Sequence, residues 1–239
     1  MLYASYPLNL VSYRVFRRPL FEPSNLISGY RCKYGKTVFA CPGGNSELQF
    51  LNRFEPNVKQ IISQFRDGDA VDVGANFGLY TVLMSKCLSD HGSVLSIEPD
   101  PSYYSFLADN IALNKCRNVT PLNIAAWSTT SKLTIRRHIF GGPMKDSIVE
   151  HTEGVIDAKP LDQVFSDYSI KPTLVKIDVE GAEHEVLRGM ERTLRATEPN
   201  VIFEALDQQA LAKCTSLLEE SGYSVRPLPD GNFLGLPGD

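Results

Sequence analysis

An apolar run that ends in a glycine-containing turn, AVDVGANFG at residues 70–78, constrains the fold more than any other stretch of this sequence. The apolar residues predict a short buried strand, and Gly74 and Gly78 predict a sharp turn from that strand into a helix. Glycine accepts a positive φ and leaves no side chain between the backbone and a ligand, so backbone N–H groups of the turn are expected to face the ligand. The run therefore predicts an α/β protein with a nucleotide-binding turn.

The spacing of the glycines separates two kinds of nucleotide ligand. A dinucleotide fingerprint has glycines at the first, third and sixth positions of the turn. This sequence has Gly74, Asn76 and Leu79 at those positions. The pattern G-x-N-x-G thus argues against a nicotinamide dinucleotide, and an ordinary tight turn without a ligand is the other alternative.

Strand and helix signals alternate along the chain after this turn. The expected strands are residues 70–73, 93–97, 119–124, 174–177 and 201–203, and the expected helices are residues 77–87, 101–114, 183–195 and a segment ending at residue 218. Such alternation predicts a doubly wound parallel sheet. Two further short segments, residues 223–225 and 232–234, are expected to form an antiparallel hairpin at one edge of the sheet.

Two other regions lack this alternation. Residues 1–66 are expected to form an N-terminal cap within the same unit, with a hairpin over residues 30–41 and a helix over residues 54–65. Apolar residues near the start of this cap would cover the active site or a second subunit, so a homo-oligomer through the cap is one alternative. Residues 140–157 are expected to form a long loop of the kind used as a lid or a binding loop.

Charge and composition exclude several classes of partner. The net charge is −4 and no long run of lysine or arginine occurs, so we expect no nucleic-acid partner. No apolar run approaches the ~18 residues of a membrane span. The five cysteines are scattered, which indicates neither a zinc site nor a disulfide framework. A cytoplasmic protein with free thiols is expected.

Polar side chains follow two of the expected strands. Glu98 ends the second strand twenty residues after Gly78, where nucleotide-binding α/β sheets place a carboxylate that accepts hydrogen bonds from both ribose hydroxyls. An acid at a helix N-terminus is the other interpretation, but Asp100 already fills that role. In the segment KIDVEGAE after the fourth strand, alternation places Lys176 and Asp178 on the same side. We therefore predict Asp178 as the catalytic carboxylate, with Lys176 and Glu180 assisting, against the alternative of a purely structural turn.

Four segments, DVGANFGLYT, SIEPDP, KIDVEGAEHEVLRGM and IFEAL, resemble the FkbM family of class I S-adenosylmethionine-dependent methyltransferases over residues 67–205. The resemblance implies an α/β fold for residues 67–239, a doubly wound Rossmann-like class I methyltransferase sheet with an antiparallel C-terminal edge hairpin. It implies S-adenosylmethionine as the cofactor and S-adenosylhomocysteine as the product. The expected cofactor-binding residues are Asp72, Gly74, Ala75, Asn76, Gly78, Glu98, Asn123 near the adenine, and Asp178.

The resemblance also implies O-methylation of a small-molecule or glycan acceptor. The acceptor is either a hydroxyl on a sugar, glycolipid or natural product, or a carboxylate. An alcohol has to lose its proton, for which Asp178 or Glu180 would serve as a base, whereas a carboxylate needs none. A divalent cation held by Asp178, Glu204 and Asp207 is a rival to acid–base chemistry.

Two other functions remain as alternatives. A nicotinamide-dependent oxidoreductase would share the fold and the carboxylate after the second strand, but not the glycine pattern. A non-catalytic S-adenosylmethionine-binding module would keep the fold without turnover. Lys176, Asp178 and Glu180 are all present, which favours an enzyme over a module that only binds the cofactor.

Overall fold

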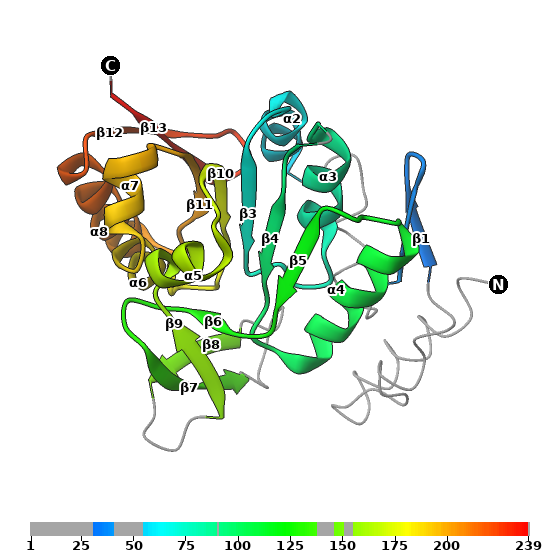
Figure 1. The fold of residues 1–239 in the computed structure, drawn as a ribbon. Coiled ribbons are helices and arrows are strands. Elements are labelled where there is room, and N and C mark those ends of the chain that lie inside the picture. Colours follow the sequence, from blue (N-terminus) through cyan, green and yellow to red (C-terminus); the bar gives the residue numbers. More distant parts are fainter. Residues whose placement is uncertain (1–30, 41–54, 90, 138–145, 151–154, 239) are drawn as a thin grey trace, which may run out of the picture.

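A seven-stranded sheet forms the centre of the molecule (Figure 1). The structure is a computed structural model that describes residues 31–40, 55–89, 91–137, 146–150 and 155–238. In spatial order the strands are β12 (Tyr223–Pro227), β13 (Asn232–Pro237), β11 (Asn200–Glu204), β10 (Pro172–Ile177), β3 (Asp69–Val73), β4 (Val94–Ile97) and β5 (Val119–Leu122).

The pairing within this sheet confirms the predicted topology. Strands β11, β10, β3, β4 and β5 are parallel to their neighbours in this order. Strand β13 pairs antiparallel with both β11 and β12, so the last two strands form the predicted edge hairpin. β10 is buried at every position except Thr173, and β3 at every position except Asp69, as expected of parallel strands covered on both faces.

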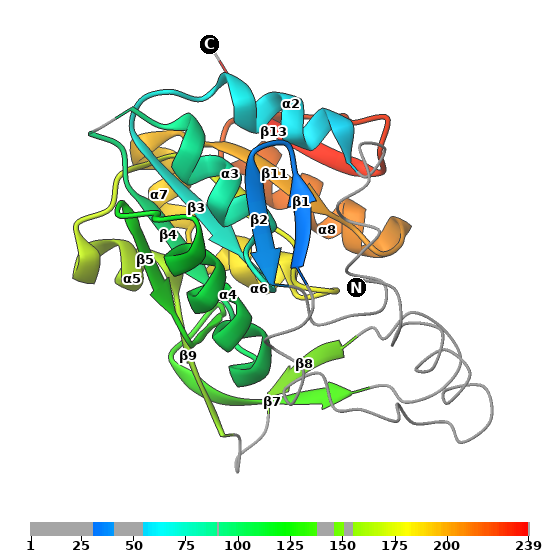
Figure 2. The same ribbon diagram turned by 90° about the vertical axis from the view of Figure 1, so that its right-hand side faces the viewer.

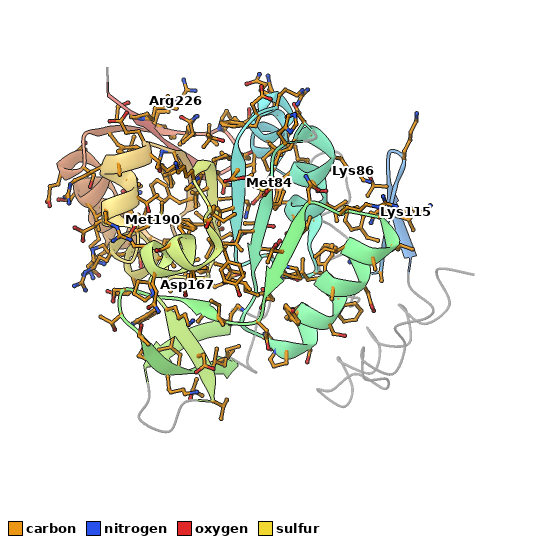
Figure 3. The ribbon with its side chains drawn as sticks, in the orientation of Figure 1. Met84, Lys86, Lys115, Asp167, Met190 and Arg226 are labelled. Atoms are coloured by element: carbon orange, nitrogen blue, oxygen red, sulfur yellow. The ribbon has the colours of Figure 1, made fainter. Side chains whose placement is uncertain are left out.

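Helices cover both faces of the sheet. One face carries α2 (Pro56–Gln64), α3 (Leu79–Cys87) and α4 (Pro101–Leu113), and the other carries α5 (Leu161–Tyr168), α6 (Glu183–Arg188), α7 (Glu191–Thr197) and α8 (Gln208–Glu220). Met84 and Met190 belong to the separate apolar clusters on these two faces, and Figure 3 shows them on α3 and beside α7. Asp100 caps α4 and Pro101 is its first residue, as predicted.

The single helix predicted over residues 183–195 is wrong, because the segment forms two helices, α6 and α7, that are separated at Gly189. A Cβ on Gly189 would lie 2.2 Å from the carbonyl oxygen of Trp127, so the backbone passes close to another segment here. Asp162 then caps α7 by accepting from the backbone N–H groups of Arg192 and Thr193. The helix pattern is continuous in sequence, but these tertiary contacts divide it.

The long loop predicted over residues 140–157 is also wrong where the structure describes it. A four-stranded second sheet has the order β6 (Ala125–Ala126), β9 (Ile156–Lys159), β7 (Ser131–Arg137) and β8 (Asp146–Glu150). β8 pairs antiparallel with β7 from Leu133 opposite Glu150 to Arg137 opposite Asp146. The backbone of β8 finds its hydrogen-bond partners in β7, and the sequence of β8 alone does not predict this pairing.

The predicted hairpin and helix of the N-terminal region are both present. β1 (Arg31–Tyr34) and β2 (Thr37–Ala40) are antiparallel, and Gly35 turns between them with a φ of 58°. Figure 2 shows this hairpin in front of the layer that contains α3 and α4. The apolar residues proposed for oligomerisation lie outside the described residues, and the division at residue 66 stays a prediction. Within the described ranges, no helix is long and apolar enough to cross a membrane.

Candidate functional site

The site lies where the order of the strands reverses. From β3 the chain adds β4 and β5 on one side, and later adds β10 and β11 on the other. Ligands of open α/β sheets bind at the carboxyl ends of the strands at such a switch point. The glycine turn follows β3 and Asp178 follows β10, so the two most informative sequence segments meet at this point.

Gly74 fixes how closely these segments approach. Its φ is 80°, and a Cβ at this position would lie 1.8 Å from the carbonyl oxygen of Asp178. Gly78 has a φ of 91°, and its Cβ would lie 2.7 Å from a methyl carbon of Leu107 on α4. Both glycines are therefore required by backbone conformation and by close packing.

The backbone N–H groups of the turn are used within the protein, which corrects the expectation that they face the ligand. Gly74 and Ala75 both donate to the carbonyl of Ile97, at 2.9 and 3.0 Å. Asn76 donates to Glu98, and Gly78 donates to the carbonyl of Ala75. The N–H of residue 77 donates to the Asn76 side chain. The turn is thus not a set of free donors for a phosphate group.

Glu98 joins the turn to the end of the neighbouring strand. Its carboxylate accepts from the backbone N–H of Asn76 at 2.7 Å and of Asp100 at 2.8 Å. Burial raises the pKa of Glu98 to about 8, although these two hydrogen bonds act in the opposite direction. Each carboxylate oxygen has a second lone pair, so two further hydrogen bonds are within its capacity. Asn123, which is exposed, donates to the carbonyls of Glu98 and Pro99.

Lys176 and Asp178 form an ion pair, with Nζ 2.9 Å from Oδ2. This confirms the expectation that the two side chains share one side of β10. Lys176 is 1% exposed, whereas the side chain of Asp178 is 29% exposed. Burial by itself lowers the pKa of Lys176, but Asp178, Asp72 and Glu55 outweigh it and raise the pKa, so the ammonium is charged.

Asp72 lies opposite Lys176 on β3 and is buried. Its Oδ2 accepts from the hydroxyl of Thr81 at 2.6 Å, and its Oδ1 has no hydrogen-bond partner among the described residues. Burial raises the pKa of Asp72, against the opposing effects of Lys176 and Thr81. The side chain thus ties β3 to α3, and its contact with a cofactor stays a prediction.

The turn after β10 is closed by a glutamate. Glu180 has a φ of 54° in this turn, and its side chain is partly exposed. The buried Glu183 accepts from the N–H groups of Val179 and Gly181 at 3.2 and 3.1 Å. Glu183 therefore holds the turn that presents Asp178 and Glu180.

Three side chains near the Lys176–Asp178 ion pair were not predicted from the sequence. The Tyr80 hydroxyl donates to Glu55, and the side-chain amide of Asn232 donates to the same carboxylate at 3.2 Å. Nζ of Lys176 lies 4.5 Å from the centre of the Tyr80 ring, which is a cation–π contact. Because these residues come from α3, the start of α2 and β13, only the tertiary fold brings them together.

Residues 72–225 match the family described as the methyltransferase FkbM domain. The chain belongs to this family. It is therefore a methyltransferase by family, which confirms the resemblance found in the four sequence segments. Within the described ranges of this FkbM chain, no group of three or more histidine, cysteine, aspartate or glutamate side chains is placed to hold a metal ion. Asp207, one of the predicted ligands, instead caps α8 by accepting from Ala210 N–H at 2.8 Å.

Relatives with curated names are also methyltransferases. "Methyltransferase 1" of Beauveria bassiana is 24% identical in an alignment of 215 positions, gaps included, that covers 79% of this chain and 86% of that protein. "Hexuronic acid methyltransferase AglP" of Haloferax volcanii is 28% identical in an alignment of 178 positions, gaps included, that covers 72% of this chain and 71% of that protein. The solved structure of the methyltransferase FkbM from Methylobacillus flagellatus has a TM-score of 0.51 and 21% identity. It covers 71% of this FkbM chain, which spans 43% of that protein.

Proposed function

We propose that this chain uses S-adenosylmethionine to methylate a hydroxyl group of a small-molecule or glycan acceptor. The observation that carries the proposal is the direct contact between the glycine turn and Asp178, where Gly74 leaves no room for a Cβ. A cofactor lying over the turn would bring its reacting end to the Lys176–Asp178 pair. Membership of the methyltransferase FkbM family supports the reaction type.

The turn suits a cofactor that lacks phosphate groups. All five of its N–H groups from residue 74 to residue 78 have partners within the protein, so a pyrophosphate would find no donors here. S-adenosylmethionine has no phosphate, and its ribose offers two hydroxyl donors that the spare lone pairs of Glu98 would accept. Gly74, Ala75, Asn76 and Gly78 would then supply surface rather than hydrogen bonds. This pattern argues against the nicotinamide-dependent alternative.

The chemistry needs little from the protein beyond position and a proton acceptor. When bound, S-adenosylmethionine supplies an electrophilic sulfonium methyl group. In our proposal Asp178 would accept the proton of the acceptor hydroxyl, whose oxygen would take the methyl group as the carbon–sulfur bond breaks and S-adenosylhomocysteine leaves. Lys176 holds the Asp178 carboxylate in place through the 2.9 Å ion pair, and Glu180 assists from the same turn. Holding the two reactants in line supplies much of the acceleration.

The charges around the pair favour a hydroxyl over a carboxylate as the acceptor. Lys176 interacts with three carboxyl groups, those of Asp178, Asp72 and Glu55. A negatively charged acceptor would meet like charges, whereas a hydroxyl would meet hydrogen-bond acceptors. The hexuronic acid named for the relative AglP carries both groups, which makes uronic acids a discriminating substrate set.

The test combines binding with turnover. We expect the protein to bind S-adenosylhomocysteine and not NAD in calorimetry, and to transfer labelled methyl groups to members of a panel of sugars and uronic acids. Asp178→Asn is expected to bind S-adenosylhomocysteine within about threefold of the unsubstituted protein and to lose turnover by about 10²–10⁴-fold. The matched control is Asp167→Asn on α5, because Asp167 is exposed and its carboxylate pairs with Lys159 of β9 rather than with Lys176 (Figure 3 labels Asp167).

Product chemistry separates the two acceptor groups, because a methyl ester is hydrolysed by mild base and a methyl ether is not. We expect a base-stable product whose formation survives chelation of divalent cations.

Full turnover by Asp178→Asn would contradict the catalytic assignment. Binding of S-adenosylhomocysteine without transfer to any acceptor would favour the non-catalytic module.

A further inference from the structure

The hairpin β1–β2 is attached to α4 by two asparagine side chains rather than by another strand. Asn110 accepts from Ala40 N–H at 2.6 Å and donates to the Ala40 carbonyl at 2.8 Å. Asn114 accepts from Val38 N–H at 3.3 Å and donates to the Val38 carbonyl at 2.8 Å. Four residues of helix rise about 6.0 Å and two residues of strand about 6.6 Å, so the two spacings match.

Asn110 makes one contact that Asn114 lacks. Its side-chain amide also donates to the carbonyl of Phe77 at 2.7 Å, inside the glycine turn. Asn110 is fully buried, and this one amide group therefore links the hairpin, α4 and the turn. The ring of Phe39 on β2 meets the ring of Phe77 edge to face, with centres 6.3 Å apart. Hairpin and turn are thus joined by a shared polar group and by an aromatic contact.

The backbone of the turn has a conformation that few residues adopt. Gly74, Asn76 and Gly78 all have positive φ, and Asn76, with a φ of 53°, has a Cβ. Most residues with a side chain avoid this region, and asparagine is one of the few that adopt it. Such a conformation persists only where the surrounding structure fixes it. The bond from Asn110 to Phe77 is one of the contacts that fix it.

We propose that Asn110 is a positioning residue for cofactor binding, through which docking of the β1–β2 hairpin and occupation of the turn stabilise each other. The inference rests on the proposed function, because it takes the turn to be the cofactor site. Coupling between two sites is reciprocal, so a cofactor that favours the ordered turn must also favour the docked hairpin. The hairpin would then affect cofactor binding through the turn that it supports.

The test compares Asn110→Ala with Asn114→Ala. Both variants lose two hydrogen bonds to β2, but only Asn110→Ala loses the bond to Phe77. We expect Asn110→Ala to weaken S-adenosylhomocysteine binding by about tenfold or more in calorimetry, and Asn114→Ala to stay within about twofold. Equal affinities in the two folded variants would overturn the proposal.

Hydrogen exchange of the unsubstituted protein decides the matter even where Asn110→Ala fails to fold. We expect saturating S-adenosylhomocysteine to slow exchange of the Ala40 amide more than exchange in α8, which is on the other face of the sheet. No preferential slowing at Ala40 would overturn the coupling. Failure of the unsubstituted protein to bind S-adenosylhomocysteine would instead overturn the proposed function, and the inference with it.

Discussion

At the scale of single residues, Glu98 is subject to opposing influences on its charge. Its burial favours the protonated acid, while the N–H groups of Asn76 and Asp100 favour the carboxylate, and the pKa is raised to about 8. A carboxyl with this pKa is protonated in a large fraction of molecules at neutral pH. The folded protein therefore changes its proton content in a range where most carboxyls do not.

This raised pKa predicts how stability depends on pH. The unfolded chain releases the Glu98 proton near pH 4.5 and the folded protein near pH 8, so the folded state holds more protons between these values. The unfolding free energy must then fall as the pH rises through this window, by up to about 1.4 kcal/mol per pH unit from this one group. Glu98→Gln is expected to make the decline shallower, as measured by urea unfolding at pH 5.5, 6.5 and 7.5.

Some decline is expected to remain in this variant, because burial also raises the pKa of Asp72 and of Glu183. The matched control is Glu219→Gln, which replaces an exposed carboxyl on α8 and is expected to leave the slope as it is. Identical slopes for Glu98→Gln and the unsubstituted protein would show that Glu98 does not titrate in this window.

At the scale of elements, the break between α6 and α7 depends on the absence of one side chain. Gly189 has a φ of −70°, which any residue adopts, so alanine would not strain the backbone. Its Cβ would instead lie 2.2 Å from the Trp127 carbonyl oxygen and 3.3 Å from Cα of Pro160. We expect Gly189→Ala to lower the unfolding free energy by about 2–3 kcal/mol in urea titrations, because backbone has to move.

Gly235→Ala is the control for this prediction. Its Cβ would lie 3.3 Å from a side-chain methyl of Leu218 and in ordinary van der Waals contact with Tyr223 and Val201, at 3.5 and 3.6 Å. No backbone atom has to move, so a cost below ~1 kcal/mol is expected. Equal losses in the two variants would mean that close backbone approach does not set the division between α6 and α7.

Features that depend on local sequence patterns could be predicted, whereas features that depend on contacts between distant segments could not. Gly74, Glu98 and the Lys176–Asp178 pair were predictable because strand-end positions and period-two alternation are local properties of the sequence. Tyr80 and Glu55 were not, because 25 positions separate them in the sequence and only the packing of α2 on α3 joins them. The acceptors Ile97 and Glu98 of the turn N–H groups could not be predicted either, because Ile97 ends the neighbouring strand β4 and Glu98 follows it.

At the scale of the whole molecule, distant parts of the chain complete one another. Asp230, in the turn between β12 and β13, accepts from the N–H groups of Asn57 and Val58 at 2.9 and 3.2 Å. The first turn of α2 is thus capped by a residue that is distant in the sequence but adjacent in the fold. No side chain at the N-cap position of α2 itself performs this task.

Asp230→Ala is therefore expected to destabilise a helix far away in the sequence. The loss of a cap costs about 0.5–2 kcal/mol, and hydrogen exchange in α2 is expected to accelerate. Asp207→Ala serves as the comparison, because Asp207 caps α8 within its own segment and its loss is expected to accelerate exchange in α8. Unchanged exchange in α2 of the Asp230 variant would contradict the long-range cap.

The capping of α2 by Asp230 also sets an order of events during protein synthesis. The ribosome releases the N-terminal parts of a chain first, so α2 emerges long before residue 230 is made. The backbone N–H of Asn57 finds its acceptor in Asp230, 173 positions later in the chain. The carboxylate of Glu55 accepts from Asn232, 177 positions later. The side-chain hydrogen bonds at the start of α2 therefore form only after the turn between β12 and β13 and the first residue of β13 have been made.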